Sequence, residues 1–197
     1  MNKPTQNNET VSFADEKLVL VNEQDEVIGY GDKYDIHLKD IQRHRAFSIL
    51  IFNSNGDLLV QQRSEEKPLW PLYFSNTCCS HPRRNETFEE ATDRRLQEEM
   101  GLSADLHYLY KFEYKEDYIE KGETIGSEHE ICRVYVGVTD DEPNPNRTEV
   151  KSWRTMTPAA IDKAIESNPE DYSPWFKMEW LTIREYHWHK VEKLLSN

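Results

Sequence analysis

Two adjacent cysteines and a nearby histidine, Cys78, Cys79 and His81, are the densest group of reactive side chains in the sequence. They lead through a short basic loop into a carboxylate-rich stretch at residues 86–102. Thiols and imidazoles transfer protons and bind metals, and carboxylates do both. Such a concentration predicts a reactive site, and a purely structural role would not explain it.

A second group of side chains has the types that bind transition metals. Glu128 and Glu130 are two residues apart on an expected strand, so both carboxylates project from one face. His37, His44 and His81 offer imidazoles. Nitrogen and carboxylate ligands suit zinc or manganese better than magnesium. A single histidine is more often structural or exposed than a ligand, so the residues alone leave these three histidines open.

Basic side chains gather around the cysteine pair, although the net charge of the chain is -13. The acidic total argues against a nucleic-acid partner, because a phosphate backbone requires a basic face. Charged clusters are usually solvated surface, but this one flanks the cysteines and predicts a local site for a small anion. Its members are Arg63, Lys67, Arg83, Arg84, Arg94 and Arg95.

Length and composition indicate one globular domain. The chain has 197 residues, of which 37% are hydrophobic, enough for a full core. No apolar run approaches the roughly 20 residues of a membrane span, and the polar N-terminus lacks a signal-peptide pattern. Three cysteines, two of them adjacent, do not form a disulfide framework. We therefore expect a cytoplasmic protein.

The expected elements combine strands and helices in an α/β (α+β) arrangement. Residues 1–16 are expected to be a flexible tail, and residues 17–197 a single domain. Expected strands are residues 17–22, 46–52, 57–63, 105–114, 128–139 and 150–156, with a hairpin turn at 53–56. Expected helices start near residue 86, at 158 and at 174, and end at 100, 167 and about 195. Residues 33–45, 115–127 and 140–149 are expected to be irregular, the last of them as a surface loop. A mixed sheet packed by helices is the natural architecture.

The helix near residue 86 resembles the Nudix box, a loop and helix that hold divalent metal on carboxylates to grip a diphosphate. The resemblance lies in residues 94–102 and in Glu86 upstream. Ser80 stands where the box begins with glycine, and Arg95 stands where a metal-binding glutamate follows the arginine. Nudix hydrolases rely on that glutamate, so a cation in its place disfavours hydrolysis.

Beyond the box, the chain resembles the type 1 isopentenyl-diphosphate isomerases, a Nudix branch that moves a double bond. The match runs from about residue 17 to the C-terminus, in the family's order. It consists of Lys33-Tyr34, His37, residues 44–48, Gln62-Arg63, Lys67, Trp70-Pro71, residues 76–82, Arg94-Arg95, residues 128–130 and Ser173-Pro174-Trp175. The resemblance implies a Nudix-like mixed β-sheet core sandwiched by helices.

The resemblance also implies residue roles. Catalysis would fall to Cys79, Glu130, Tyr114 and Trp175. The substrate diphosphate would be bound by Lys33, Arg63, Lys67 and Arg95. Metal ligands would be His37, His44, His81, Glu128, Glu130 and Glu99. One zinc or manganese ion would occupy the site of three histidines and two glutamates, and magnesium would bridge the diphosphate to Glu99.

The implied chemistry explains why a thiol and a carboxylate are both present. An unactivated alkene is protonated at one carbon and deprotonated two carbons away, which requires an acid and a base in a site closed to water. Adjacent residues of an extended segment point to opposite faces, and the position relative to His81 selects Cys79 over Cys78. The partner would be a small prenyl diphosphate, with no nucleic acid or membrane, and the chain a monomer or homodimer. The rival hypotheses are a Nudix hydrolase of a diphosphate and a non-catalytic, zinc-bearing protein that binds prenyl diphosphates.

Overall fold

The computed structural model describes residues 8–196, and the central strand of its sheet is β3 (His44–Phe52). β3 is buried along nearly its whole length because it lies between other strands and has both faces covered. It pairs in parallel with β8 (Glu123–Val138) and antiparallel with β6 (Cys78–Ser80). The other strands are β1 (Lys17–Val21), β2 (Val27–Asp32), β4 (Leu58–Arg63), β5 (Phe74–Ser75), β7 (His107–Glu120) and β9 (Val150–Met156).

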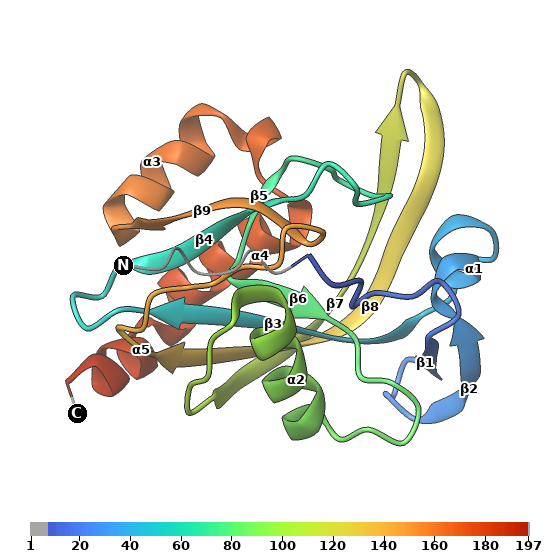
Figure 1. Cartoon of the computed structure of the whole chain (residues 1–197), viewed down its shortest axis with the longest axis horizontal. Coiled ribbons are helices and arrows are strands. Elements are labelled where there is room, and N and C mark those ends of the chain that lie inside the picture. The colour runs from blue at the N-terminus through green and yellow to red at the C-terminus, as the bar shows by residue number, and fades with distance from the viewer. Residues whose placement is uncertain (1–7, 197) are drawn as a thin grey trace.

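Helices cover both faces of this sheet (Figure 1). α2 (Phe88–Met100) packs Ala91, Leu96 and Met100 against one face. On the other face lie α3 (Pro158–Ser167), α4 (Pro174–Thr182) and α5 (Trp188–Leu195), which enclose the larger hydrophobic cluster. The expected mixed sheet between helices is therefore confirmed.

Helix α2 has clear signals at both ends. Thr87 is the N-cap and forms a capping box with Glu90, so the helix begins at Phe88, slightly later than the sequence suggested. Gly101 ends it at a φ of 64°, in the left-handed region that glycine adopts at little cost. A Cβ at this position would lie 2.9 Å from the carbonyl oxygen of Asn144, so glycine is also required by packing.

The expectation that residues 33–45 are irregular was wrong. Lys33–Leu38 forms a short helix, α1, and β3 already begins at His44. The helix is too short to be stable alone. Ile36 anchors it by packing on Leu18 and Leu20 of β1.

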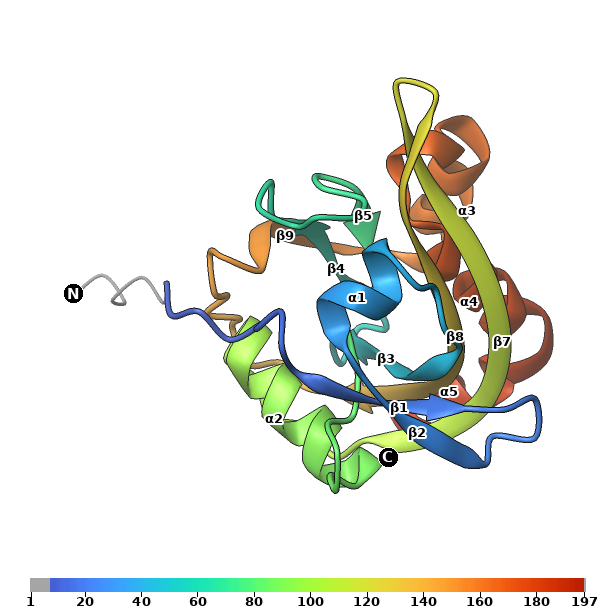
Figure 2. The ribbon, with the colours of Figure 1, turned by 90° about the vertical axis from the view of Figure 1, so that its right-hand side faces the viewer.

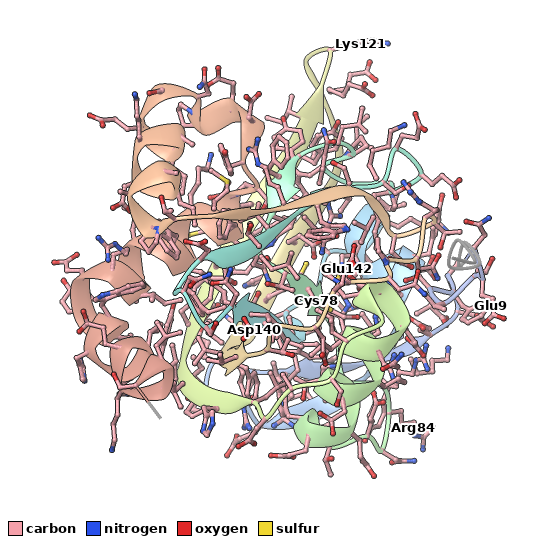
Figure 3. The ribbon with its side chains drawn as sticks, turned by 60° about the vertical axis from the view of Figure 1, so that its left-hand side comes forward. Glu9, Cys78, Arg84, Lys121, Asp140 and Glu142 are labelled. Atoms are coloured by element: carbon pink, nitrogen blue, oxygen red, sulfur yellow. The ribbon has the colours of Figure 1, made fainter. Side chains whose placement is uncertain are left out.

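The expected loop at residues 115–127 is instead part of a long hairpin. β7 and β8 stay paired as far as Glu120 and Glu123, and the chain turns at Lys121 and Gly122, both at positive φ. Lys121 lies at the tip of this hairpin, far from the centre of the sheet (Figure 3). The hairpin continues because the strands hydrogen-bond to each other although their side chains are mostly exposed.

Two further differences concern the later part of the chain. The loop at residues 140–149 is not wholly at the surface, since Asn146 and Glu149 are buried. The expected long C-terminal helix is divided by a π-helical turn, Ile183–His187, between α4 and α5. Within the described residues, no helix is long and apolar enough to cross a membrane.

Candidate active site

Five predicted metal ligands lie together beside α1. His37 comes from α1, His44 from β3, His81 follows β6, and Glu128 and Glu130 lie on β8. Their nearest ligand atoms all lie within 4.8 Å of one another. The parallel register pairs His44 directly with Glu130, and α1 lies against β8 (Figure 2). Strand alternation puts both glutamates on the same face.

Backbone carbonyls orient two of the imidazoles. His37 Nδ1 lies 2.6 Å from the Lys33 carbonyl oxygen, and His44 Nδ1 lies 2.8 Å from that of Gln42. A proton on each Nδ1 leaves Nε2 with a free lone pair directed at the cluster, the arrangement typical of histidine ligands. His37 Nε2 then lies 2.9 Å from Glu128, and His81 Nε2 lies 2.9 Å from Glu130.

Unsatisfied atoms in the cluster fit a bound cation. Among the described residues, His44 Nε2 is buried and has no hydrogen-bond partner, and the buried Glu128 Oε2 faces His37 Nε2, which cannot donate to it while Nδ1 carries the proton. Burial together with the neighbouring imidazoles of His44 and His37 holds the pKa of His81 well below its usual range, so this ring stays neutral. Neutral imidazoles and carboxylates are the forms that bind a divalent metal. The cluster can therefore hold a metal ion.

The position of Cys79 follows from a gap between β3 and β4 into which the Thr77 side chain inserts. These strands form the predicted hairpin, but their only register pair is Phe52 with Leu58. The Thr77 hydroxyl fills the gap, accepting from the Ile51 N–H and donating to the Leu59 carbonyl. β6 is thereby placed beside β3, with Cys79 opposite Ser48.

The two cysteines of β6 face different surroundings. Cys78 is buried in the cluster under α2 (Figure 3), whereas Cys79 is half-buried and lines a pocket with Glu130 and Trp175. Burial raises the pKa of the Cys79 thiol to about 12, and the Arg63 guanidinium, 3.9 Å from Sγ, acts in the opposite direction. Cys79 is therefore a thiol at neutral pH.

Glu130 connects the metal-ligand cluster to the pocket. Its Oε1 faces His81, and its Oε2 accepts a hydrogen bond of 2.7 Å from the Tyr114 hydroxyl. Burial raises the pKa of Glu130, but His44 and Tyr114 outweigh it and lower the pKa overall. The carboxylate is thus ionised and held at both oxygens.

Trp175 forms part of the pocket wall near the start of α4. Its Nε1 donates to Ser75 Oγ at 3.0 Å, which fixes the plane of the indole. The ring meets Trp70 edge-on, with centroids 5.3 Å apart, and the Arg63 guanidinium lies 5.1 Å from the Trp175 ring centroid. Trp175 and Arg63 line a cavity with a volume of about 310 Å³.

The four predicted diphosphate ligands line the same cavity, at its cationic end. Arg63 is fixed by donating to the carbonyls of Leu69 and Trp70, both at 2.9 Å. Lys67 pairs with Glu149, and Arg95 lies 3.3 Å from the same carboxylate. Lys33, the remaining predicted ligand, lies beside the N-terminal segment, 3.4 Å from Ser12 Oγ. By contrast Arg83, Arg84 and Arg94 from the predicted basic cluster do not line the cavity.

Sequence reasoning missed Glu149. It is 2% exposed and lines the cavity, and the ammonium of Lys67 and the guanidinium of Arg95 outweigh its burial and hold its pKa well below the usual range. Lys67 precedes it by 82 residues, so no local motif links them. The only available signal was an acidic residue directly before an apolar strand.

The N-terminal segment also contributes to the cavity. The Ser12 hydroxyl lies 3.4 Å from both Lys33 Nζ and Arg95 Nη2, and Glu16 pairs with Lys33 at 3.4 Å. Burial lowers the pKa of the Lys33 ammonium. Residues 1–7 of the expected tail lie outside the described residues, and the tail boundary at residue 16 stays a prediction.

The sixth predicted metal ligand, Glu99, stands apart from the five. It is buried on α2, pairs with Arg95, and lies 3.5 Å from the Gln61 amide. Arg95 lines the cationic end, but Glu99 itself lies behind it, outside the cavity lining. The His/Glu cluster is the group that the described residues arrange for a metal ion, and a magnesium ion at Glu99 stays a prediction.

Comparison with known proteins identifies the family. The model of the NUDIX domain matches residues 42–176. A crystal structure from Deinococcus radiodurans superposes with a TM-score of 0.62 and 25% identity, covering 77% of this chain and 90% of that one. A MutT protein from Methanosarcina mazei gives 0.54 at 14% identity, covering 77% and 94%, which shows a shared fold.

Curated relatives are more specific. A protein from Photorhabdus laumondii named isopentenyl-diphosphate Delta-isomerase 1 is 42% identical, over 89% of this chain and 99% of its own length. An isopentenyl-diphosphate Delta-isomerase from Saccharopolyspora erythraea is 40% identical, over 83% and 84%. The chain therefore belongs to the Nudix family and, within it, to the isopentenyl-diphosphate Delta-isomerases.

Proposed function

We propose that this chain interconverts isopentenyl diphosphate and dimethylallyl diphosphate, and so acts in isoprenoid biosynthesis. The observation that carries the proposal is the meeting of a thiol, Cys79, and a tyrosine-bonded carboxylate, Glu130, in one cavity with a cationic end. Allylic rearrangement needs an acid and a base beside an apolar chain. Hydrolysis of a diphosphate needs neither the thiol nor the indole wall.

The two groups would move one proton onto the substrate and another off it. Glu130, supported by the Tyr114 hydroxyl, adds a proton to the alkene, and Cys79 removes a proton two carbons away. The roles reverse with direction, so the substrate and product differ only in the double-bond position. Without substrate, the raised pKa of Cys79 and the lowered pKa of Glu130 mean that Cys79 is a protonated thiol and Glu130 an ionised carboxylate. This protonation state is ready for the reaction direction in which Cys79 donates the proton.

The cation-like state between these steps needs a dry and electron-rich wall. Trp175 supplies an indole face, and such a contact stabilises a desolvated cation by about 2 kcal/mol. The Trp70 ring packs edge-on against the same indole and limits its movement. Water would trap the cation as an alcohol, so the enclosing walls are part of the chemistry.

Metal ions would serve the two ends of the cavity differently. We propose zinc or manganese on His37, His44, His81, Glu128 and Glu130. When bound, such an ion supplies positive charge that orients Glu130 and tunes its acidity. Magnesium would accompany the diphosphate at Glu99, while Lys33, Arg63, Lys67 and Arg95 bind the phosphate oxygens.

The proposal extends to the organisation of the protein. We infer that residues 17–197 act as a single domain, and that the protein is a cytoplasmic monomer or homodimer whose partner is the small prenyl diphosphate. The acidic total of -13 supports the absence of a nucleic-acid partner. The local cations then select a compact anion.

Incubation of the full chain with isopentenyl diphosphate, magnesium and either zinc or manganese tests this function, with acid-labile allylic product as the readout. Cys79→Ala should lower kcat by about 100- to 10,000-fold, the range of a lost acid or base. Cys78→Ala is the matched control, because Cys78 lies on the other side of β6, and it should retain kcat.

Other outcomes would replace the proposal. Phosphate release without allylic product would establish a hydrolase. Binding of prenyl diphosphate without turnover, unaltered in Cys79→Ala and Glu130→Gln, would establish a binding protein. Full activity in Cys79→Ala would remove the thiol from the mechanism.

A further inference from the structure

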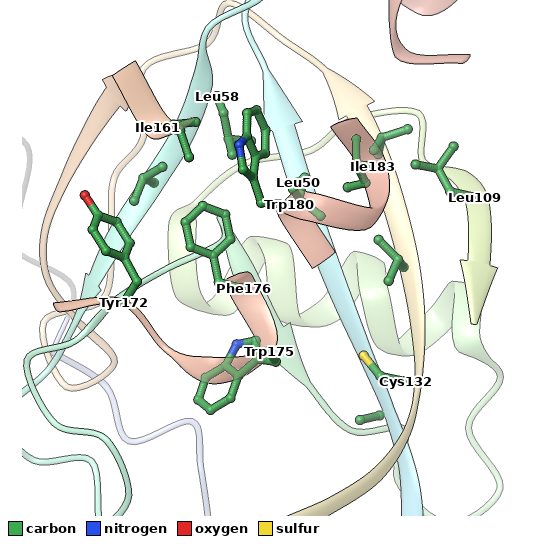
Figure 4. Close-up of a cluster of buried hydrophobic side chains, with 14 of the residues drawn as sticks. Leu50, Leu58, Leu109, Cys132, Ile161, Tyr172, Trp175, Phe176, Trp180 and Ile183 are labelled. Atoms are coloured by element: carbon green, nitrogen blue, oxygen red, sulfur yellow. The ribbon is translucent and has the colours of Figure 1, made fainter. Parts of the chain in front are cut away.

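Glu179 is a buried carboxyl group that the proposed mechanism does not use. It lies on α4, one helical turn after Trp175, and is 0% exposed. Neither carboxyl oxygen has a hydrogen-bond partner among the described residues. Cys132 on β8 is among its neighbours. Figure 4 shows Cys132 across the hydrophobic cluster from Trp175, which lies on the same helix as Glu179. An unpaired carboxylate is strongly disfavoured there, so the group takes up a proton instead.

The neighbours of Glu179 favour the neutral form. Burial raises the pKa of Glu179 to about 8, and the Glu130 charge on β8 acts in the same direction. The Ser48 hydroxyl on β3 acts in the opposite direction, although this contact does not reach hydrogen-bond geometry in the structure. Cys132 on β8 and Tyr110 on β7 also face the group, and burial raises the pKa of both, so they stay neutral near pH 8.

Ser48 lies between Glu179 and the cavity. It is opposite Cys79 in the register of β3 and β6, and both residues line the cavity. Side chains of a directly opposed antiparallel pair project from the same face with Cβ atoms about 5 Å apart. The Ser48 Oγ already lies 3.6 Å from the Cys132 thiol, which can donate to it.

We propose that Glu179 is a protonated carboxylic acid that donates to Ser48 and thereby directs the Ser48 hydroxyl hydrogen toward Cys79. A hydroxyl accepts two hydrogen bonds and donates one. The Cys132 thiol takes one acceptor position, and a rotation of the Glu179 side chain that brings its acid proton to Ser48 fills the other, so the hydroxyl hydrogen is left for the cavity. An ionised Glu179 can only accept, and it would draw that hydrogen back from Cys79. Glu179 is thus a positioning residue, and this last link rests on the proposed isomerase function.

The protonation state is tested without any assay of turnover. The infrared spectrum at pH about 6 should contain a carboxylic-acid carbonyl band that Glu179→Gln removes and Glu166→Gln, an exposed control on α3, retains. The unfolding equilibrium gives a second measure. An unfolded glutamate ionises near 4.5 and folded Glu179 near 8, so the folded state binds the extra proton between these values.

Because the folded state binds this extra proton, its stability falls as pH rises. Wild type should lose stability relative to Glu179→Gln as pH rises through this window, by about tenfold in the folding equilibrium constant per pH unit, and the difference should level off above pH about 8. Glu179→Leu also removes the carboxyl group. It provides the same comparison of stability against pH should the Glu179→Gln variant fail to fold. A missing carbonyl band with a pH-independent difference would show an ionised Glu179 and overturn the proposal.

The positioning role has its own readout. The amide of Glu179→Gln can still donate to Ser48, so it should keep more kcat than Glu179→Leu. Wild-type kcat should fall relative to Glu179→Gln above pH about 8, and Ser48→Ala should abolish this difference. Equal pH profiles, with the infrared band present, would leave a neutral acid and refute the link to Cys79. An inactive wild type would refute the isomerase function while leaving the infrared and unfolding tests intact.

Discussion

The two ends of the cavity handle charge in opposite ways. At the metal-ligand cluster, backbone carbonyls fix two of the imidazoles and leave ligand atoms without a donor, as His44 Nε2 shows among the described residues. At the cationic end, Lys67 and Arg95 already share Glu149. The first end is completed by adding a cation. Under the proposed function, the second end takes up the diphosphate by exchanging Glu149 for phosphate oxygens.

This difference indicates how each end achieves selectivity. The paired strands β3 and β8 hold three of the five predicted metal ligands, His44, Glu128 and Glu130, at fixed spacing, which favours one coordination geometry. Protein carboxylates hold the cations in place before the substrate arrives, and this prevents their mutual repulsion in a buried site. A diphosphate must then compete with Glu149, which disfavours weaker anions.

Loss of the metal should have the largest effect, because it removes the positive charge that we propose orients Glu130. Chelation should abolish turnover and lower the melting temperature, and zinc or manganese should restore both. With metal at about 100 times its dissociation constant, binding stabilises the fold by about 2.7 kcal/mol. His44→Ala, which leaves Glu130 intact, should behave like the chelated protein.

Exposed His107→Ala is the matched control for that experiment, since His107 lies outside the cluster. Metal content measured on each protein separates binding from catalysis. Full turnover of metal-free protein would contradict any role for the cluster in the reaction.

Neutralising Lys67 should have an intermediate effect. Lys67→Met removes a charge-assisted contact to the diphosphate, so KM should rise about 10- to 100-fold. It also leaves Glu149 in excess beside Arg95, so stability should fall. In the double variant Lys67→Met/Glu149→Gln the charges balance again, and stability should recover while KM stays high.

Substrate kinetics and denaturant unfolding on the four proteins of this cycle measure the two effects separately. Recovery of both KM and stability would show that Lys67 acts only as the partner of Glu149. If neither KM nor stability recovers in the double variant, the charges of Lys67 and Glu149 do not neutralise each other in the wild-type protein.

The sequence predicted the sheet-and-helix architecture and the side chains that meet in the cavity, because both leave local signals. Thr87 and Gly101 delimit α2, and the alternation of Glu128 and Glu130 puts both carboxylates on one face. The helical conformation of α1 was missed because it depends on Ile36 packing against a separate strand. The hairpin near Lys121 was missed because its exposed side chains carry no apolar alternation.

Glu149 was missed for a related reason. Its burial and its two cations come from contacts that are distant in sequence, and a loop with two prolines suggests solvent exposure. The same applies to Ser12, which meets Arg95 across 83 residues. Motifs identify the groups that act on a substrate, whereas the partners that hold those groups beforehand appear only in the fold.

The smallest expected effect concerns acid stability and tests whether Glu149 is ionised between its cations. Lys67 and Arg95 hold its folded pKa below the unfolded value of 4.5, in spite of its burial. The unfolded state therefore binds the extra proton first as pH falls, and wild type loses up to about 1.4 kcal/mol of stability per pH unit below pH about 4.5. Glu149→Gln should start less stable, because Lys67 loses its carboxylate partner while Arg95 keeps those of Glu98 and Glu99, but it should show a shallower acid slope in denaturant unfolding. Parallel slopes would mean that Glu149 is protonated, and the cationic end would then lie open to a phosphate without exchange.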